Sequence, residues 1–317
     1  MSAGPSLDDI RVAARRIAPF IHRTPVMTCA ALDALCGARL YFKCENLQKT
    51  GSFKIRGATN AILQLTPAEA ARGVVTQSSG NHAAAVARAA SARGIPAHIV
   101  MPKNAPAVKC RAVEGYGGVI TFCEPNIESR EAACRRLLEE TKGVLVHPYN
   151  DRRVIAGQGT AALELLEDVP ELDVLLVPVS GGGLLSGNAI AATGVRPAVR
   201  VIGCEPANAD DAFRSLKSGR LEKNEAADTI ADGLRANLCE LTFGILRERV
   251  DEIVRVTEQE IVEAMRLVWE RMKLIIEPSA AVALAPAIRR AIRAEGKRVG
   301  VLLSGGNVDL SALPFHG

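Results

Sequence analysis

Short apolar runs alternate with alanine-rich helical stretches through the middle of the chain. Apolar runs at 74–76, 97–101, 119–123 and 144–147 predict strands, and the segments near 82–92, 106–115 and 128–141 predict helices. Successive β-α-β units of this kind form a parallel sheet with helices on its faces. The pattern therefore predicts an α/β unit in this region.

The same rhythm resumes after residue 150. Strands are predicted at 173–179, 199–206, 252–256 and 298–305, and helices at 157–169, from 184, after a capping box of Thr257 and Glu260, and from about 279. We find no low-complexity tract and no internal repeat. The predicted organisation is two α/β lobes: a large domain formed by 1–71 and 149–317, and a small mobile domain formed by 72–148.

Composition narrows the class of protein without changing this picture. The 317 residues are 48% hydrophobic and 23% charged with a net charge of +4, which is typical of a soluble globular protein. The basic residues are scattered without interleaved aromatic residues, and no apolar run is long enough to span a membrane, so neither nucleic acid nor a membrane is expected as a partner. The eight cysteines are dispersed without metal-ligand spacing, and the N-terminus does not read as a secretory signal. Both observations predict the cytoplasm.

A glycine-rich turn is the first candidate for chemistry. A buried apolar run breaks into Ser180, Gly181, Gly182 and Gly183 and then enters a helix at Leu184. Three glycines let several backbone N–H groups face one anion, and the helix dipole adds to the attraction. The turn lacks both the Walker and the dinucleotide spacing. It predicts a phosphate site, with an ordinary strand-to-helix turn as the alternative.

Two further turns and one lysine extend this candidate site. Ser78, Ser79, Asn81 and His82 follow one predicted strand, and Ser304 follows another. Ligands in open parallel sheets bind beyond the carboxyl ends of the strands. The segment "GSFKIRG" places Lys54 beside Phe53, and a desolvated lysine can lose its proton and attack a carbonyl. Three polar turns together with a nucleophilic lysine are hard to explain as structural turns alone.

Pyridoxal phosphate is the phosphate-bearing cofactor that forms an imine with lysine, and it gives each of these groups a role. Lys54 would hold the aldehyde and the glycine turn the phosphate. Asn81 would contact the ring hydroxyl, Ser304 the pyridine nitrogen, and Phe53 the face of the ring. A pyridoxal-phosphate-binding protein without turnover and a nucleotide-binding module remain alternatives from other functional classes.

The motifs, in their order, resemble the fold-type II pyridoxal-phosphate enzymes, the group of tryptophan synthase β-chain and threonine dehydratase. The resemblance rests on "FKCENLQKTGSFKIRGA", "SSGNH", "VIAGQGT", "EPANADD", "TIADG", "LVWERMKLIIEPSA" and "LLSGGNVDL". It implies two open parallel-sheet lobes with the cofactor between them. It also implies Lys54 as the Schiff-base lysine, Ser79 as the acid and base on the opposite face, and Ser180 to Leu184 as the phosphate cradle.

The resemblance implies ligands for a metal and for a substrate as well. A divalent cation, Mg²⁺ or alternatively Ca²⁺ or Mn²⁺, would bind Glu205, Asp211 and the carbonyl of Ala209, oxygen ligands that suit these ions. The alternative is a solvated acidic loop. Glu277 would lie close to the cofactor ring or would start a helix. The substrate would contact the following residues: Ser78, Ser79, Asn81, His82 and Arg130, the last of which is otherwise a surface charge.

The implied activity is the interconversion of L- and D-serine, with elimination to pyruvate and ammonia as a side reaction. The alternative is a dehydratase of threonine or 3-hydroxyaspartate with little racemisation. "SSGNH" favours the first, because biosynthetic threonine dehydratases carry "SAGNH". A small-molecule amino acid is the expected partner, and the family implies a homodimer.

Two departures from the mammalian racemases of the family bear on these expectations. Thr50, Lys109 and Tyr116 match residues of the implied nucleotide site, where ATP would bind as an effector. Ala84, however, replaces a glutamine of that site and counts against activation by ATP. Ala236 and Asn237 replace a pair of serines near the implied position of the substrate carboxylate, so the substrate preference is expected to shift.

Overall fold

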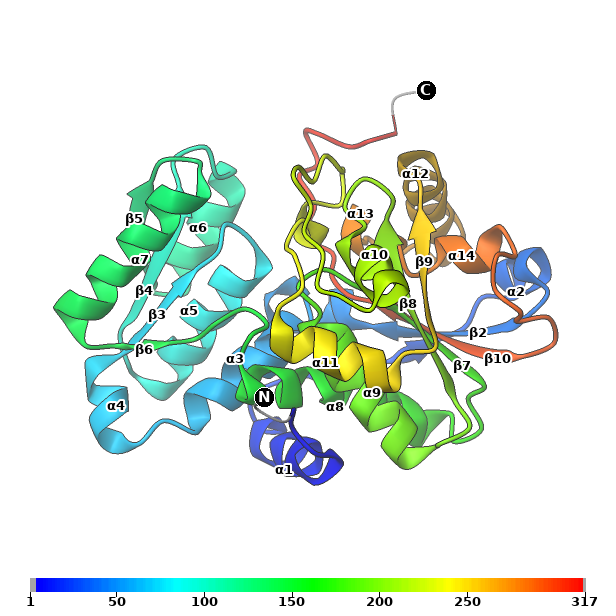
Figure 1. Cartoon of the computed structure of the whole chain (residues 1–317), viewed down its shortest axis with the longest axis horizontal. Helices are drawn as coiled ribbons and strands as arrows, with labels where there is room; N and C mark the ends of the chain where they lie inside the picture. Colours follow the sequence, from blue (N-terminus) through cyan, green and yellow to red (C-terminus); the bar gives the residue numbers. More distant parts are fainter. Residues whose placement is uncertain (1–3, 316–317) are drawn as a thin grey trace.

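The computed structural model describes residues 4–315 and shows two β-sheets side by side (Figure 1). The larger sheet has the strand order β1-β2-β10-β7-β8-β9, and the smaller has the order β5-β4-β3-β6. All neighbouring strands are parallel except β1 and β2. The predicted α/β class with two open parallel-sheet lobes is confirmed.

The elements have the following bounds. The strands are β1 (Val26–Met27), β2 (Arg39–Cys44), β3 (Val74–Gln77), β4 (Ala97–Pro102), β5 (Val119–Cys123), β6 (Val144–Leu145), β7 (Val174–Pro178), β8 (Arg200–Pro206), β9 (Glu252–Val256) and β10 (Arg298–Leu303). The helices are α1 (Leu7–Ile17), α2 (Ala30–Cys36), α3 (Lys54–Leu63), α4 (Pro67–Arg72), α5 (Asn81–Arg93), α6 (Ala107–Gly115), α7 (Ile127–Thr141), α8 (Arg152–Asp168), α9 (Gly183–Val195), α10 (Asp211–Ser218), α11 (Glu240–Arg249), α12 (Glu258–Leu267), α13 (Pro278–Ala281) and α14 (Ala285–Ile288).

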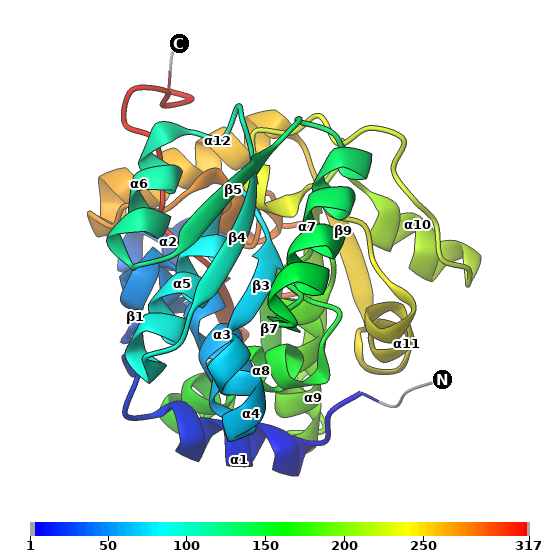
Figure 2. The same ribbon diagram turned by 90° about the vertical axis from the view of Figure 1, so that its left-hand side faces the viewer.

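Both faces of the smaller sheet are covered by helices (Figure 2). Side chains alternate along a strand, so neighbouring residues of β3 and β4 enter opposite layers. Val74 and Ile99 pack in the layer that contains α3 and α5, whereas Val75 and Val100 pack against α7. This explains why these strands are apolar at every position and not at every second one.

The larger sheet is built in the same way. One layer packs α2, α12, α13 and α14 against residues such as Leu40 and Val301, and the other packs α1, α8, α9 and α11 against residues such as Leu175 and Leu302. The strands of the smaller sheet all lie within residues 72–148, and those of the larger sheet all lie outside that range. Where the domains divide, and whether the smaller one moves, stay predictions.

A buried ionic network joins α3 to β2 and α8. The Arg56 guanidinium, fully buried, donates to both carboxylate oxygens of Glu45 (2.7 and 2.8 Å) and of Glu164 (2.7 and 2.8 Å). The ammonium of Lys43 lies 2.6 Å from Glu164 and donates to the carbonyl of Thr24 at 2.7 Å. Buried charges require this degree of pairing. The network fixes the first turn of α3, two residues beyond Lys54.

Every predicted strand has a counterpart among β3 to β10, with one notable difference in length. The strand expected at 144–147 ends at Leu145, because the Val146 carbonyl accepts from the hydroxyl of Thr76 (2.8 Å) and the ring of His82 (3.0 Å) instead of continuing the ladder. The helix expected from about 279 is interrupted between α13 and α14, because Pro286, in the first turn of α14, has no N–H to donate to the preceding turn.

Candidate active site

Lys54 is the first residue of α3 and points its amine into the interior. Its Nζ donates to the carbonyl of Pro148 at 3.1 Å and lies 5.1 Å from the centroid of the Phe53 ring. The N–H of Phe53 donates to the carbonyl of Ser304 at 3.0 Å, which brings the end of β10 beside the lysine. Burial lowers the pKa of Lys54 to about 8, although the negative charge of Glu277 acts in the opposite direction. The amine is therefore readily deprotonated.

Glu277 is a buried carboxylic acid held between the two lobes. The amide nitrogen of Asn81 donates to both of its carboxylate oxygens (2.8 and 3.1 Å), and its own N–H donates to the carbonyl of Gly305 at 3.0 Å. Burial and the charge of Asp232 raise the pKa of Glu277 to about 7. Glu277 precedes α13 as its N-cap, yet its side chain makes no capping hydrogen bond and bonds to Asn81 instead.

The turn at 180–183 accepts only glycine at its centre. A Cβ on Gly181 would lie 2.4 Å from the ring of Tyr149, and one on Gly182 would lie 2.7 Å from the Cβ of Thr242. Gly182 also has a φ of +84°, which L side chains rarely adopt. The turn leads directly into α9, whose first N–H groups have no partner within the helix. This geometry suits an anion.

Ser78 and Ser79 lie in the turn between β3 and α5, and His82 is the second residue of α5. The hydroxyl of Ser78 accepts from the N–H of Gly80 at 3.3 Å, and the N–H of Ser78 donates to the carbonyl of Val100 at 3.1 Å. His82 donates from Nε2 to the carbonyl of Val146 at 3.0 Å. Burial and the charge of Lys54 lower the pKa of His82 to about 3, so this imidazole is neutral.

Tyr149 is a residue of this site that our sequence reasoning missed. Its ring meets that of His147 edge to face, with centroids 4.7 Å apart, and covers the glycine turn from behind. Burial raises the pKa of its phenol. Arg130, in the first turn of α7, is half-buried, and no described residue accepts a hydrogen bond from its Nε. The usable signal for Tyr149 was its position just after a predicted strand, the same position that singled out Ser78 and Ser304.

The predicted metal ligands also lie together, at the end of β8 and the start of α10. The oxygens of Glu205 accept from the N–H groups of Ala212 (3.0 Å) and Phe213 (2.9 Å), and those of Asp211 accept from Asn224 (2.8 Å) and Leu238 (2.8 Å). Burial, with Asp211 beside it, raises the pKa of Glu205 well above its usual range. The nearby cations, Arg214 and Arg255, pair with Asp210 instead (2.8 and 3.1 Å), and Ala209 is buried in the same turn.

The described residues contain no cluster of three or more His, Cys, Asp or Glu side chains suited to a metal. A cation at this position would therefore depend on the two carboxylates, a backbone carbonyl and water.

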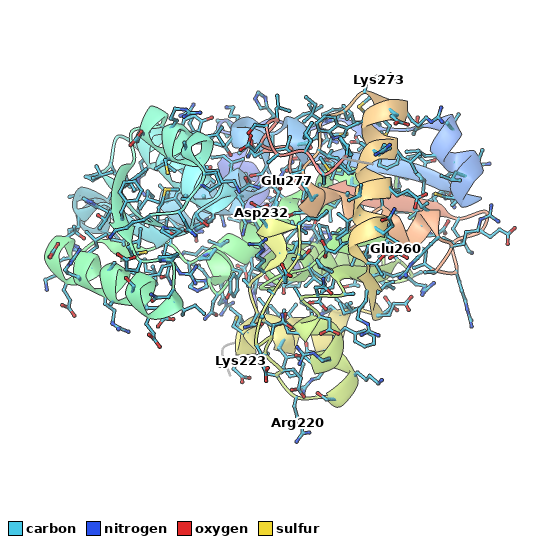
Figure 3. The ribbon with its side chains drawn as sticks, turned by 90° about the horizontal axis from the view of Figure 1, so that it is seen from above. Arg220, Lys223, Asp232, Glu260, Lys273 and Glu277 are labelled. Atoms are coloured by element: carbon cyan, nitrogen blue, oxygen red, sulfur yellow. The ribbon has the colours of Figure 1, made fainter. Side chains whose placement is uncertain are left out.

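Of the residues that match an effector site, Lys109 makes a contact between the lobes and Thr50 one within the larger lobe. Thr50 has a φ of +65°, and its carbonyl accepts from Asn307 at 2.8 Å. Lys109, on α6, forms an ion pair with Asp232 of the larger lobe. Figure 3 shows Asp232 beside Glu277 near the junction of the lobes.

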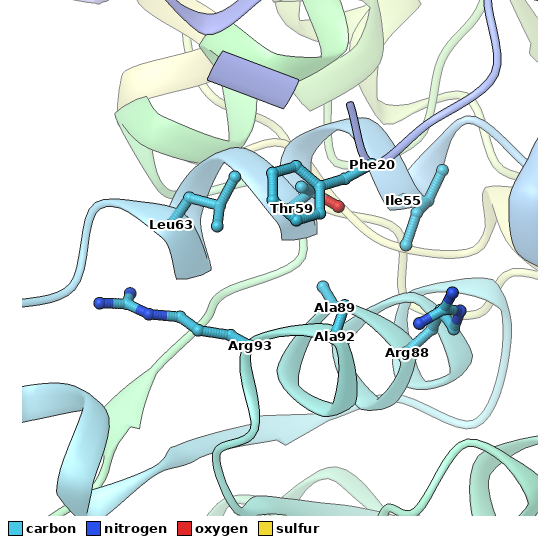
Figure 4. A pocket seen from close by; sticks show the side chains of 8 residues that line it. All are labelled: Phe20, Ile55, Thr59, Leu63, Arg88, Ala89, Ala92 and Arg93. Carbon is cyan, nitrogen blue, oxygen red and sulfur yellow. The ribbon is translucent and has the colours of Figure 1, made fainter. Parts of the chain in front are cut away.

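A small hollow between α3 and α5 contains none of the predicted site residues (Figure 4). It is lined by Phe20, Ile55, Thr59, Leu63, Arg88, Ala89, Ala92 and Arg93. Arg93 donates to the carbonyl of Leu65 at 2.6 Å and to that of Ile62, so its charge is bonded to the end of α3. The hollow is a contact between helices and not an extension of the site.

Residues 17–305 match the family model described as "Pyridoxal-phosphate dependent enzyme". The chain belongs to this family. This pyridoxal-phosphate-dependent enzyme is 50% identical over 312 residues to a serine racemase of Oryza sativa subsp. indica, covering 97% of this chain and 92% of the other. It is 49% identical over 312 residues to a β-hydroxyaspartate dehydratase of Paracoccus denitrificans, covering 98% and 99%.

The structure of maize serine racemase superimposes on this pyridoxal-phosphate-dependent enzyme with a TM-score of 0.96 at 50% identity, covering 98% of this chain and 95% of the other. The fold is therefore that of the fold-type II enzymes, as the motifs predicted. Among the residues that the structure describes, no helix combines the length and the apolar character that crossing a membrane requires.

Proposed function

We propose that this enzyme interconverts L- and D-serine and, as a second reaction, eliminates water from serine to release pyruvate and ammonia. The observation that carries the proposal is the site itself. A buried lysine whose pKa is lowered to about 8 donates to the carbonyl of Pro148, and the next residue, Tyr149, packs its ring against the glycine turn. Identity of 50% with the rice serine racemase, over nearly the whole of both chains, supports the choice of substrate.

The residues present fit pyridoxal phosphate. Lys54 would hold its aldehyde and Ser180 to Leu184 its phosphate, and Phe53, Asn81, Glu277 and Ser304 would surround the ring. A Cβ at Gly181 or Gly182 would collide with Tyr149 or Thr242, so only glycine permits this turn, which leads its backbone N–H groups into the start of α9. When bound, the ring supplies the electron sink that makes the α-proton of an amino acid removable.

Inversion of the α-carbon needs a proton donor and acceptor on each face. The amine of Lys54 serves one face and the hydroxyl of Ser79 the other. The imidazole of His82, neutral because of its burial, offers no positive charge to this step, and none of residues 4–315 bonds to its Nδ1. Ser78, Asn81 and Arg130 would orient the substrate.

A second candidate function is dehydration of 3-hydroxyaspartate or threonine with little racemisation. The relative from Paracoccus denitrificans, named as a β-hydroxyaspartate dehydratase, is 49% identical to this chain. Ala236, one of the two departures near the expected substrate carboxylate, lies against the cradle, because its backbone N–H donates to the hydroxyl of Ser180 at 3.0 Å. This position next to the site supports a substrate preference different from that of the mammalian racemases.

Further parts of the proposal concern the cation, the effector and the assembly. Mg²⁺, or Ca²⁺ or Mn²⁺, would bind Glu205, Asp211 and the Ala209 carbonyl, because two adjacent buried carboxylates without a paired arginine or lysine favour a cation. ATP is a weaker candidate as an effector, since Lys109 is already paired with Asp232. We also propose a homodimer located in the cytoplasm, in which residues 72–148 close over the substrate. The free thiols support a reducing compartment.

The experiment supplies purified protein with pyridoxal phosphate, Mg²⁺ and L-serine, and follows D-serine by chiral chromatography and pyruvate in the same tube. Both products are expected, and both disappear in Lys54→Ala together with the visible absorbance of the lysine-bound cofactor. In Ser79→Ala, D-serine formation should fall by about 10²-fold or more, the typical contribution of a general acid or base. Pyruvate from L-serine should fall less.

Ser91→Ala is the matched control, because Ser91 is exposed on the far part of α5. Pyruvate alone, or no reaction until threonine or 3-hydroxyaspartate is supplied, would replace the racemase proposal with the dehydratase.

A further inference from the structure

Residues 236–239 connect the acidic pair, Glu205 and Asp211, to the glycine turn. We call these residues the bridging segment. On one side, the N–H of Ala236 donates to the hydroxyl of Ser180 at 3.0 Å, and that hydroxyl donates to the Ala236 carbonyl at 3.3 Å. On the other side, the N–H of Leu238 donates to the carboxylate of Asp211 at 2.8 Å. One short stretch of backbone is thus bonded to both sites.

Two more contacts strengthen the connection. The side chain of Asn237 accepts from the N–H of Asn224 at 2.9 Å, and the side chain of Asn224 donates to Asp211 at 2.8 Å. A Cβ at Gly182 would lie 2.8 Å from a methyl group of Leu238, so this side chain packs directly against the turn. The bridging segment cannot shift at Asp211 without disturbing the turn at Ser180 and Gly182.

We infer that the bridging segment couples the two sites, so that a divalent cation at the acidic pair tightens the binding of the cofactor phosphate, with Ser180 as the positioning residue. The inference rests on the cofactor and cation of the proposed function. Without a cation, the described residues hold Glu205 and Asp211 only by hydrogen bonds from Ala212, Phe213, Asn224 and Leu238. A cation bound by both carboxylates would hold Asp211, and through the bridging segment Ser180, in the conformation seen here. The turn is then already ordered when the phosphate binds, so binding costs less conformational entropy.

The test measures the affinity of the full chain for pyridoxal phosphate, with Mg²⁺ or with EDTA, by the visible absorbance of the lysine-bound cofactor. We expect Mg²⁺ to tighten binding by about fivefold or more, which is the lower end of typical coupling between sites. In Ser180→Gly, which keeps the backbone N–H groups, the ratio of the two affinities should fall towards one. Because the ratio is compared, any direct loss of phosphate contact in the variant cancels.

Two further variants separate coupling from a general loss of structure. Asn237→Ala leaves the bonds of Ser180 and Asp211 in place and should reduce the ratio in part. Thr193→Ala is the control, since Thr193 lies on the same helix as the turn and its hydroxyl bonds only to the Ala189 carbonyl at 2.8 Å. It should keep the wild-type ratio.

Reciprocity supplies an independent measurement: pyridoxal phosphate should raise the affinity for Mg²⁺, measured by calorimetry, by the same factor. A wild-type ratio of one, or a Ser180→Gly ratio equal to that of the wild type, would overturn the inference and leave the proposed function standing. Absence of the cofactor absorbance at any concentration would instead overturn the proposed function and this inference with it.

Discussion

At the scale of single residues, the pKa values in the site are set by burial, because, among the described residues, the buried groups lack partners of opposite charge that would fully offset it. Burial lowers the pKa of Lys54 to about 8, raises that of Glu277 to about 7 so that this acid holds its proton more tightly than an exposed one, and keeps His82 uncharged. These three shifts have one cause, since Lys54, Glu277 and His82 come together where the lobes meet. Perturbed groups of this kind gather at functional sites.

The neutral state of His82 makes a prediction for stability against pH. Its pKa is about 3 in the folded protein and about 6.5 when unfolded, so the unfolded chain binds more protons between these values. Stability is therefore lost as the pH falls through this window. In His82→Gln, whose amide can still donate to the Val146 carbonyl, the loss between pH 7.5 and pH 5 should be smaller by about 2 kcal/mol.

Urea unfolding followed by far-UV circular dichroism at the two pH values measures this difference. Glu277, whose raised pKa acts with the opposite sign, is present in both proteins and cancels in the comparison. Parallel pH profiles for the wild type and His82→Gln would show that His82 is not buried in the neutral form.

At the scale of elements, the sequence predicted the parts of the fold that depend on local pattern. The strands from β3 to β10 were recognisable because both faces of each sheet are covered, which makes them short continuous apolar runs. The break between α13 and α14 was missed because it depends on one proline within an apolar stretch. The contacts of Tyr149 and the bond of Ser180 to Ala236 were not predictable, since they join segments far apart in the chain and no local pattern marks them.

The glycine turn makes the second prediction. Gly182→Ala places a Cβ against Thr242 at a φ of +84°, so we expect affinity for pyridoxal phosphate to fall by about tenfold, which corresponds to about 1.4 kcal/mol. Gly244→Ala is the control, because Gly244 lies within α11 and a Cβ there would meet nothing within 4 Å. That change should stabilise the protein by up to about 1 kcal/mol. Titration with the cofactor and thermal unfolding distinguish the two, and equal affinities would remove the case for strain at the turn.

At the scale of the whole molecule, the two lobes are held together by polar contacts that cross the site. Asn81 reaches Glu277 and also accepts from Asn307 at 2.9 Å, and Lys109 pairs with Asp232. The pair of Lys109 and Asp232 is partly exposed, so it contributes little to stability and can open and close, whereas Glu277 is buried. The junction of the lobes is thus polar, and the predicted movement of the smaller lobe would require these contacts to break.

The ion pair between Lys109 and Asp232 makes the third prediction. Asp232→Asn should raise the KM for serine by about two- to fivefold, as expected for a partly exposed pair worth up to about 1 kcal/mol. The kcat should change less, and the effect should shrink in high salt. Glu124→Gln is the matched control, because it removes the pair with Lys103 inside the smaller lobe. Steady-state kinetics at two salt concentrations measures both, and an equal rise in the control would refute a role in closure.

The buried network around Arg56 restricts how this protein can be altered, by design or by drift. Replacement of Arg56, Glu45 or Glu164 alone leaves a charge without its partner in the interior, a change that costs about 3–5 kcal/mol in comparable proteins. Replacement of the whole set by apolar side chains of similar volume avoids that penalty. The network is therefore exchangeable only as a unit, and a library of single substitutions would report each member as indispensable although the set as a whole is not.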